Sequence, residues 1–123
     1  MPQSDIMIID DTPENLKILA GVLKDEGYKV RAVLSGQMAL TAAHVAVPDL
    51  ILLDINMPDM NGYEVCVQFK ADPQLQHIPV IFISALAGEV DTVRASEAGA
   101  VDYISKPFRF DEVLRKVEYY LQT

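Results

Sequence analysis

The chain alternates short aliphatic runs with longer segments in which apolar residues return at helical spacing. The runs Ile6–Ile9, Leu50–Leu53 and Val80–Ile83 predict strands that are buried on both faces. From Leu16 to Leu23, leucine or alanine recurs at i, i+3, i+4 and i+7, which predicts a helix with one apolar face. Strand and helix alternate five times. This order predicts an α/β fold with a parallel sheet covered by helices on both faces.

Turn formers and capping residues set the boundaries of the predicted elements. Thr12 is expected to cap the first helix, Pro13 suits its first position, and Gly27 ends it. Ser35 and Gly36 open the second helix. The expected strands cover residues 6–9, 28–34, 50–54, 80–83 and 101–105, and the expected helices cover residues 13–26, 36–47, 63–70, 89–98 and 110–121.

Two of these elements have weaker patterns than the others. In the second strand Val30, Ala32 and Leu34 alternate with Lys29 and Arg31, which predicts a partly exposed strand. The fourth helix offers only a thin apolar face, formed by Val90, Val93 and Ala98. We therefore expect that helix to be held loosely.

Composition narrows the class of protein. A chain of 123 residues, half of them hydrophobic, predicts one domain over residues 1–123. The net charge of -8 argues against direct contact with nucleic acid, which usually requires a basic surface. No apolar run reaches the roughly 20 residues of a membrane helix, so membrane insertion is not expected. The single cysteine, Cys66, cannot form an internal disulfide, and this fits a cytoplasmic protein.

Polar residues follow four of the predicted strands at their carboxyl ends. Asp10 and Asp11 end the first strand, Asp54 the third, Ser84 the fourth and Lys106 the fifth. In a parallel sheet these ends share one edge, so the side chains are expected to converge there. Three carboxylates in one place repel one another, which raises their pKa values. A divalent cation relieves this repulsion, and all-oxygen ligands favour Mg²⁺.

These residues, taken in order, resemble the receiver domains of the response regulators of two-component signalling. The resemblance rests on Asp10-Asp11, on Leu53 to Pro58 (Leu-Asp-Ile-Asn-Met-Pro), on Ser84-Ala85 and on Lys106-Pro107. It extends from Ile6 to about Leu121. The resemblance implies a three-layer, flavodoxin-like (βα)₅ fold whose five parallel strands lie in the order 2-1-3-4-5.

The resemblance also implies a role for the acids. Asp54 would accept a phosphoryl group carried by a histidine of a sensor kinase or phosphotransfer protein. Asp11 and Asp54 would bind Mg²⁺ directly, Asn56 would add its backbone carbonyl, and Asp10 would act mostly through water. The chain would thus be a phosphoacceptor signalling domain rather than an enzyme, although it would promote its own phosphorylation and slow dephosphorylation.

Further residues would stabilise and report the phosphoryl group. The Lys106 ammonium, the Ser84 hydroxyl and the backbone N–H of Ala85 would bind its oxygens, and the Lys106-Pro107 bond would be cis. Ser84 and Tyr103 would then switch the face made by the fourth helix, fifth strand and fifth helix. That face would meet an effector domain, a target protein or a second copy in a phosphorylation-dependent homodimer.

Three other functions are compatible with parts of the pattern. A phosphohydrolase similar to the haloacid dehalogenase family also uses an aspartate at a strand end, but needs an acid where this chain has Asn56. A flavodoxin-like carrier of flavin mononucleotide needs a phosphate loop rich in serine, threonine and glycine, whereas residues 10–13 read Asp-Asp-Thr-Pro. A receiver-shaped binding module that is never phosphorylated stays open as the third alternative.

Overall fold

The computed structural model describes residues 4–57, 60–84, 92–107 and 109–121. Strands and helices alternate along these residues, as the sequence predicts. The strands are β1 (Asp5–Ile9), β2 (Lys29–Val33), β3 (Leu50–Asp54), β4 (Val80–Ser84) and β5 (Asp102–Ser105). The helices are α1 (Pro13–Asp25), α2 (Gly36–Val45), α3 (Gly62–Ala71), α4 (Thr92–Ala98) and α5 (Phe110–Leu121). None of these helices has both the length and the apolar character that crossing a membrane requires.

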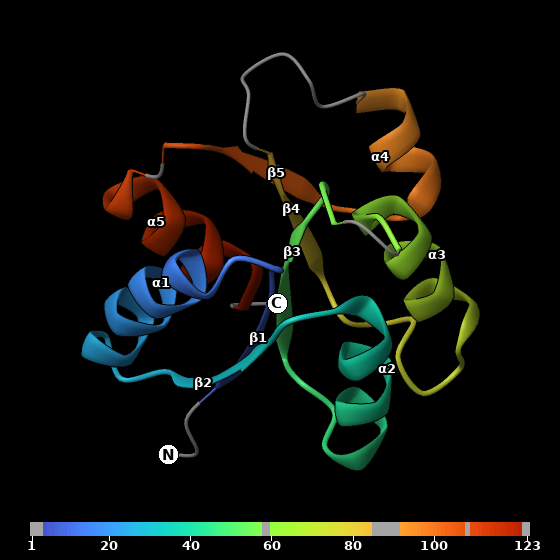
Figure 1. The fold of residues 1–123 in the computed structure, drawn as a ribbon, viewed down its shortest axis with the longest axis horizontal. Helices are drawn as coiled ribbons and strands as arrows, with labels where there is room; N and C mark the ends of the chain where they lie inside the picture. The colour runs from blue at the N-terminus through green and yellow to red at the C-terminus, as the bar shows by residue number, and fades with distance from the viewer. Residues whose placement is uncertain (1–3, 58–59, 85–91, 108, 122–123) are drawn as a thin grey trace.

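The five strands form one parallel sheet in the order β2-β1-β3-β4-β5. Helices α1 and α5 cover one face of the sheet, and α2, α3 and α4 cover the other (Figure 1). This arrangement confirms the three-layer, flavodoxin-like fold that the sequence predicts. Because all the strands are parallel, their carboxyl ends meet at one edge of the sheet.

Each face of the sheet has its own apolar core. Under α1 and α5, Leu19 and Val113 pack on the even-numbered residues of β1. Under α2, α3 and α4, Ala39 and Phe69 pack on the odd-numbered residues of the same strand. The central strand β3 is buried along its whole length, as expected for a strand between two helical layers.

Strand β2 is partly exposed, as the sequence predicts, and Val30 packs against the core under α1 and α5, but the alternation does not hold along the whole strand. Ala32 and Leu34 are exposed, whereas Val33 packs against the core under α2. Arg31 is only partly exposed: its guanidinium donates to the carbonyls of Ala42 (3.2 Å) and Ala46 (2.6 Å), and it pairs with Asp5 at 3.1 Å. A charged side chain that hydrogen-bonds the end of α2 thus takes an inward position that simple alternation gives to an apolar residue.

Helix ends confirm most of the predicted boundaries. The Ser35 hydroxyl accepts the N–H of Met38 at 3.2 Å, which caps α2. After α1, Gly27 has a φ of 92°, a conformation that favours glycine and ends the helix. The expected cap by the Thr12 side chain is wrong. Thr12 occupies the cap position without a side-chain hydrogen bond to the helix.

Helix α4 has few buried side chains, as the sequence predicts. Ala98 is buried as predicted, but Val93 is 65% exposed, and the helix buries Ala95 in its place. Val90 lies outside the described residues. Since alanine buries little surface, α4 has only a small apolar contact with the rest of the molecule.

Side chains of α5 hydrogen-bond the backbone of the edge strand β5 and of Val101, the residue before it. The Lys116 ammonium donates to the carbonyl of Tyr103 at 2.7 Å, and the Tyr120 hydroxyl donates to the carbonyl of Val101 at 3.1 Å. The N–H of Tyr103 donates to the Asp102 carboxylate at 2.7 Å. These bonds fix β5 against α5.

Candidate functional site

Three carboxylates meet at the carboxyl edge of the sheet, as the sequence predicts. Asp10 is fully buried and Asp54 is 2% exposed, while Asp11 is exposed. One oxygen from each of the three lies within 4.8 Å of the others. Two of these acids therefore lie where water cannot fully solvate them, and their charges need partners within the protein.

Asp10 is held by the turn that leads from β1 into α1. Its Oδ1 accepts the backbone N–H of Thr12 at 2.9 Å. This bond to the N–H two residues on is typical of an aspartate that begins a turn. Its Oδ2 accepts the side-chain amide of Asn15, in the first turn of α1, at 3.4 Å. The start of α1 thus fixes the orientation of this buried carboxylate.

Asp54 is held by the loop that leads from β3 into α3. Its Oδ1 accepts the backbone N–H of Asn56 at 3.2 Å. Gly62, the first residue of α3, presses against the end of the strand, since a Cβ at this position would lie 2.6 Å from the Asp54 carbonyl oxygen. Only glycine permits that approach without a backbone shift. The Asn61 side chain caps the helix that follows by accepting the N–H of Glu64 at 3.0 Å.

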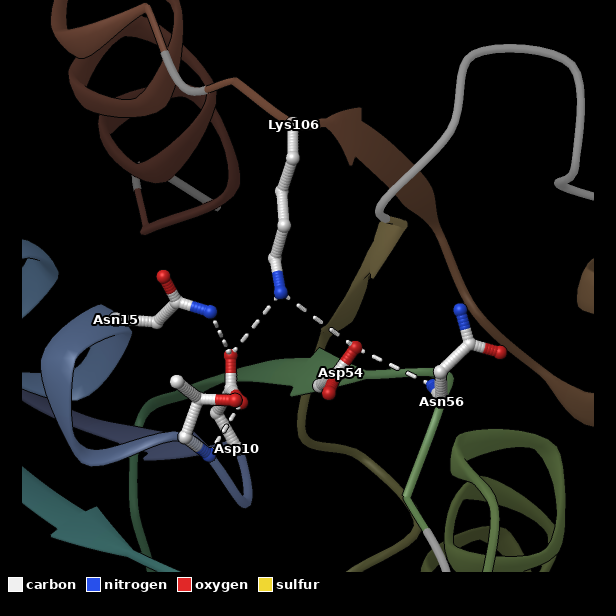
Figure 2. Close-up of polar contacts among 6 residues, drawn as sticks. Asp10, Asn15, Asp54, Asn56 and Lys106 are labelled. Carbon is white, nitrogen blue, oxygen red and sulfur yellow. Dashed lines mark hydrogen bonds and ion pairs between the residues drawn. The ribbon is translucent and has the colours of Figure 1, made fainter.

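Lys106 reaches the same acids from the end of β5. Its Nζ lies 3.4 Å from Asp10 Oδ2 and 3.9 Å from Asp54 Oδ1. Figure 2 shows the ammonium between the two carboxylates, with the Asn15 amide pointing to Asp10 from the other side. The Lys106-Pro107 peptide bond is cis, which confirms the prediction. A single cation thus bridges two of the three acids.

Burial raises the pKa of Asp54 to about 6, and the negative charge of Asp10 acts in the same direction. The Lys106 ammonium and the Asn56 N–H offset part of this effect, because both stabilise the charged form of Asp54. The expected rise in pKa is therefore confirmed for Asp54. A carboxyl group with this pKa is mostly ionised at neutral pH.

The remaining predicted site residues are Ser84, Ala85 and Tyr103. Ser84 is buried at the end of β4, one residue beyond Ile83, which pairs with Asp54 in the neighbouring strand. Ala85 lies outside the described residues. Tyr103 is 41% exposed on β5, and the Lys116 ammonium lies 5.5 Å from the centre of its ring. Tyr103 is thus turned to the surface here.

The acid cluster fits a divalent metal ion. Its three carboxylates supply hard oxygen ligands from two adjacent loops, and two of them are buried with one ammonium as their shared cation. This donor set is typical of Mg²⁺, which takes one or two carboxylates and keeps several waters. Asp10, Asp11 and Asp54 could hold such an ion.

The sequence prediction missed two residues that shape the site, Asn15 and Gly62. Asn15 follows Asp10 by five positions and lies in the first turn of a predicted helix. Asparagine has a lower helix propensity than alanine, so its presence there could have indicated a side-chain contact. Gly62 ends a run of turn-forming residues, so the sequence pattern indicates a turn there and nothing more. Its close contact with the Asp54 carbonyl depends on the path of the loop, which the residue pattern does not specify.

Comparison with protein families gives a match over most of the chain. The model described as "Response regulator receiver domain" matches residues 6–118. The chain is 41% identical to the response regulator PleD of Caulobacter vibrioides over 89% of its own length, but covers only 24% of PleD. It thus spans about a quarter of that relative. It is 37% identical to the polar-differentiation response regulator DivK of Brucella anthropi, and the match covers 98% of both chains.

A solved structure that shares the fold is described with a bound metal ion. The receiver domain of the sensor histidine kinase PA1611 from Pseudomonas aeruginosa is 28% identical, with a TM-score of 0.90 over 99% of this chain and all of that one. It is described with a magnesium ion coordinated in the active site cleft.

Proposed function

The chain belongs to the response regulator receiver domain family of two-component systems, and from this membership we propose that Asp54 is phosphorylated by a histidine-bound phosphoryl group. The observation that carries the proposal is the position of Lys106, whose ammonium lies within 4 Å of both buried acids. A cation in this place can neutralise a phosphoryl oxygen that arrives on Asp54. The role of residues 1–123 as one phosphoacceptor unit is part of the same proposal.

In the proposed reaction a carboxylate oxygen of Asp54 attacks phosphorus. The new P–O bond forms as the P–N bond to the donor imidazole breaks, and the imidazole nitrogen leaves with the electron pair. Phosphoryl transfer depends mainly on positioning and on the stabilisation of charge. The Asn56 N–H orients Asp54, Lys106 supplies positive charge, and the buried Ser84 hydroxyl lies one strand away. The N–H of Ala85 would add a further donor.

Mg²⁺ would be held by Asp10, Asp11 and Asp54, with the backbone carbonyl of Asn56. When bound, it would supply charge neutralisation for the acids and for the incoming phosphate. We expect millimolar Mg²⁺ to raise the melting temperature, because it would bind the folded acid cluster and not the unfolded chain. An unchanged melting temperature would contradict this assignment of the three acids.

Phosphorylation would be reported through Ser84 and Tyr103. A phosphoryl oxygen on Asp54 would draw the Ser84 hydroxyl toward it, and the space so vacated would admit the ring of Tyr103, now at the surface. Because α4 turns only Ala95 and Ala98 toward the core, moving it costs little packing. The α4–β5–α5 face is therefore the proposed output surface.

The proposed partners follow from this chemistry. A histidine kinase or a histidine phosphotransfer protein would donate the phosphoryl group. An effector domain, a target protein or a second phosphorylated copy would meet the α4–β5–α5 face. PleD is a much longer protein than this chain, so its additional domains indicate no output for this one.

Intact-mass measurement tests phosphorylation directly. Incubation with Mg²⁺ and acetyl phosphate, which releases acetate as its P–O bond breaks, should add one phosphoryl group to the parent protein. Asp54→Asn should add none, whereas Asp25→Asn, which removes an acid at the end of α1, should label like the parent. An unlabelled parent would contradict the proposal, and so would equal labelling of Asp54→Asn.

Hydrogen exchange tests the switch separately from the chemistry. Beryllofluoride with Mg²⁺ imitates the phosphoryl group, and it should change amide exchange in α4 severalfold while leaving α3 unchanged. Lys106→Ala should still bind Mg²⁺, yet α4 should respond poorly, because the cation that stabilises the phosphoryl group is gone. A normal response of α4 in Lys106→Ala would contradict the role given to Lys106.

A further inference from the structure

Asn15 and Lys106 share one oxygen of the buried Asp10 carboxylate. The Asn15 amide lies 3.4 Å from Asp10 Oδ2, and the Lys106 ammonium lies 3.4 Å from the same atom. The other oxygen, Oδ1, accepts the backbone N–H of Thr12. Within the described part of the chain, Asn15 and Lys106 are the side chains that donate to Asp10. One of these donors is neutral and belongs to α1, and the other is charged and follows β5.

The proposed phosphorylation makes conflicting demands on Lys106. In the structure its ammonium lies closer to Asp10 (3.4 Å) than to Asp54 (3.9 Å). Once Asp54 carries a phosphoryl group, the same ammonium would turn toward a phosphoryl oxygen and away from Asp10. A fully buried carboxylate that loses a hydrogen-bond partner is strongly destabilised. Thr12 donates to Oδ1, so when Lys106 turns away, the described side chain that still donates to Oδ2 is Asn15.

We propose that Asn15 is a positioning residue that keeps Asp10 hydrogen-bonded while Lys106 moves from Asp10 to the phosphoryl group on Asp54. This role rests on the proposed function of Asp54. An amide suits it because it is neutral: a lysine or arginine at the same place would neutralise the acids and compete with a divalent cation for them. Figure 2 shows that the amide reaches this oxygen from α1 and the ammonium reaches it from the end of β5, so the amide can stay as the ammonium leaves.

The rate of phosphorylation by acetyl phosphate at saturating Mg²⁺ tests this role. Asn15→Ala should lower the rate constant roughly three- to tenfold, as expected for the loss of one long hydrogen bond of ordinary net strength. Asn15→Leu, which keeps the size of the side chain without the amide, should show the same loss. Asn15→Gln should restore part of the rate, and Asn15→Asp should be slowest because it adds a fourth carboxylate.

A second measurement follows Lys106 itself. The NMR signal of the Lys106 side chain, assigned by its absence in Lys106→Ala, should shift when beryllofluoride and Mg²⁺ are added to the parent protein. In Asn15→Ala the shift should be smaller, because Asp10 then retains the ammonium. Gln37→Ala removes an exposed amide from α2 and should leave both the rate and the Lys106 shift unchanged.

The outcomes separate this inference from the proposed function. An unlabelled parent would contradict the phosphorylation of Asp54, and with it the role of Asn15. A labelled parent with equally fast Asn15→Ala and Asn15→Leu would contradict the role of Asn15 alone. A lower rate of Asn15→Ala that appears at limiting Mg²⁺ and disappears at saturating Mg²⁺ would also overturn it, because Asn15 would then act only on metal affinity. Asn15→Ala gains helix propensity but removes a hydrogen bond to the buried Asp10, so the folded fraction of each variant is measured by circular dichroism before its rate is compared.

Discussion

Helices α3 and α4 pack against each other on one face of the sheet, yet they are attached to it very differently (Figure 1). Helix α3 buries five residues, among them Tyr63 and Phe69, and its first residue presses on the end of β3. Helix α4 buries only the methyl groups of two alanines, Ala95 and Ala98. Helix α3 is thus firmly packed on the sheet, whereas α4 packs against α3 and the sheet with little apolar contact.

The difference matters because the two helices follow the two strands that frame the site. Strand β3 carries Asp54 and leads into α3, so the tight packing of α3 holds the proposed phosphoacceptor in place. Strand β4 carries Ser84 and leads toward α4, so a pull on Ser84 meets little resistance there. Rigid support on one side and weak attachment on the other is what a switch requires from the same sheet edge.

Truncation of one buried side chain in each helix should show the contrast most strongly. Phe69→Ala should lower the free energy of unfolding by about 3–5 kcal/mol, because a large, fully buried ring is lost and leaves a cavity. Ala95→Gly should cost only about 1 kcal/mol, mostly from helix propensity. Urea unfolding of both variants measures this. Equal losses would contradict the weak attachment of α4.

Asp54 lies at the end of the strand that α3 packs against, and its ionisation should make the free energy of unfolding depend on pH. The pKa of Asp54 is raised from its ordinary value of 3.8 to about 6 in the folded protein, so the folded state favours the protonated carboxyl. The contribution of Asp54 to the free energy of unfolding is therefore complete below pH 3.8 and is lost as the pH rises through 6. At neutral pH without metal, Asp54→Asn should therefore be more stable than the parent by about 2–3 kcal/mol. Denaturant unfolding in a chelator should show this difference narrowing as the pH is lowered toward 4. A constant difference would contradict the raised pKa.

A methyl group at the start of α3 should test the close contact with the strand. In Gly62→Ala the new Cβ would lie 2.6 Å from the Asp54 carbonyl oxygen and 2.8 Å from the Ile55 Cα, so the backbone must shift. We expect a loss of about 1–3 kcal/mol together with slower phosphorylation, because Asp54 is displaced. Gly21→Ala, in open space within α1, should instead stabilise the protein by about 0.5–1 kcal/mol. A Gly62→Ala variant as stable as Gly21→Ala would contradict this account.

The far end of α3 is tied to α2 by a weaker, exposed ion pair. His44 contacts the Asp72 carboxylate through Nε2 and the Leu40 carbonyl through Nδ1 at 2.8 Å. Both partners accept hydrogen bonds, so the ring satisfies both contacts when it carries two protons. The hydrogen bond with Asp72 accordingly raises the pKa of His44, and that of Asp72 is lowered, first by the N–H of Gln74 and then by His44.

This pair gives the smallest predicted effect. The contribution of His44 is complete below its usual pKa of 6.5 and is lost as the pH rises through the raised value, while that of Asp72 is lost only below 3.8. His44→Gln should therefore lower the melting temperature slightly at about pH 5 and not at all in mildly alkaline solution. A difference that grows as the pH rises would show that the pair does not stabilise the protein.

Much of the fold could be predicted because apolar runs and helical spacing both report burial. The strand order follows from the resemblance, and the convergence of Asp10, Asp54 and Lys106 follows from parallel strands. The inward side chains of β2 could not be predicted, because Arg31 is drawn inward by the carbonyls of α2. Partners of this kind come from distant segments and leave no period in the sequence.

The same limit applies to the site. Acids at strand ends are visible in the sequence, but Asn15 and Gly62 act through distances to other backbone segments. An asparagine in the first turn of a helix could face solvent or the strand end, and spacing alone does not decide between them. The side chains that carry charge were predicted, whereas those that support them were not.

The hydrogen bonds along β5 restrict how a partner can recognise the proposed output surface. Strand addition, in which a peptide extends a sheet by pairing with its edge, needs unpaired N–H and C=O groups. On this edge both backbone groups of Tyr103 and the carbonyl of Val101 are already bonded to side chains of Asp102, Lys116 and Tyr120. A partner at β5 must therefore recognise side chains rather than backbone, and edge-to-edge aggregation through β5 is disfavoured.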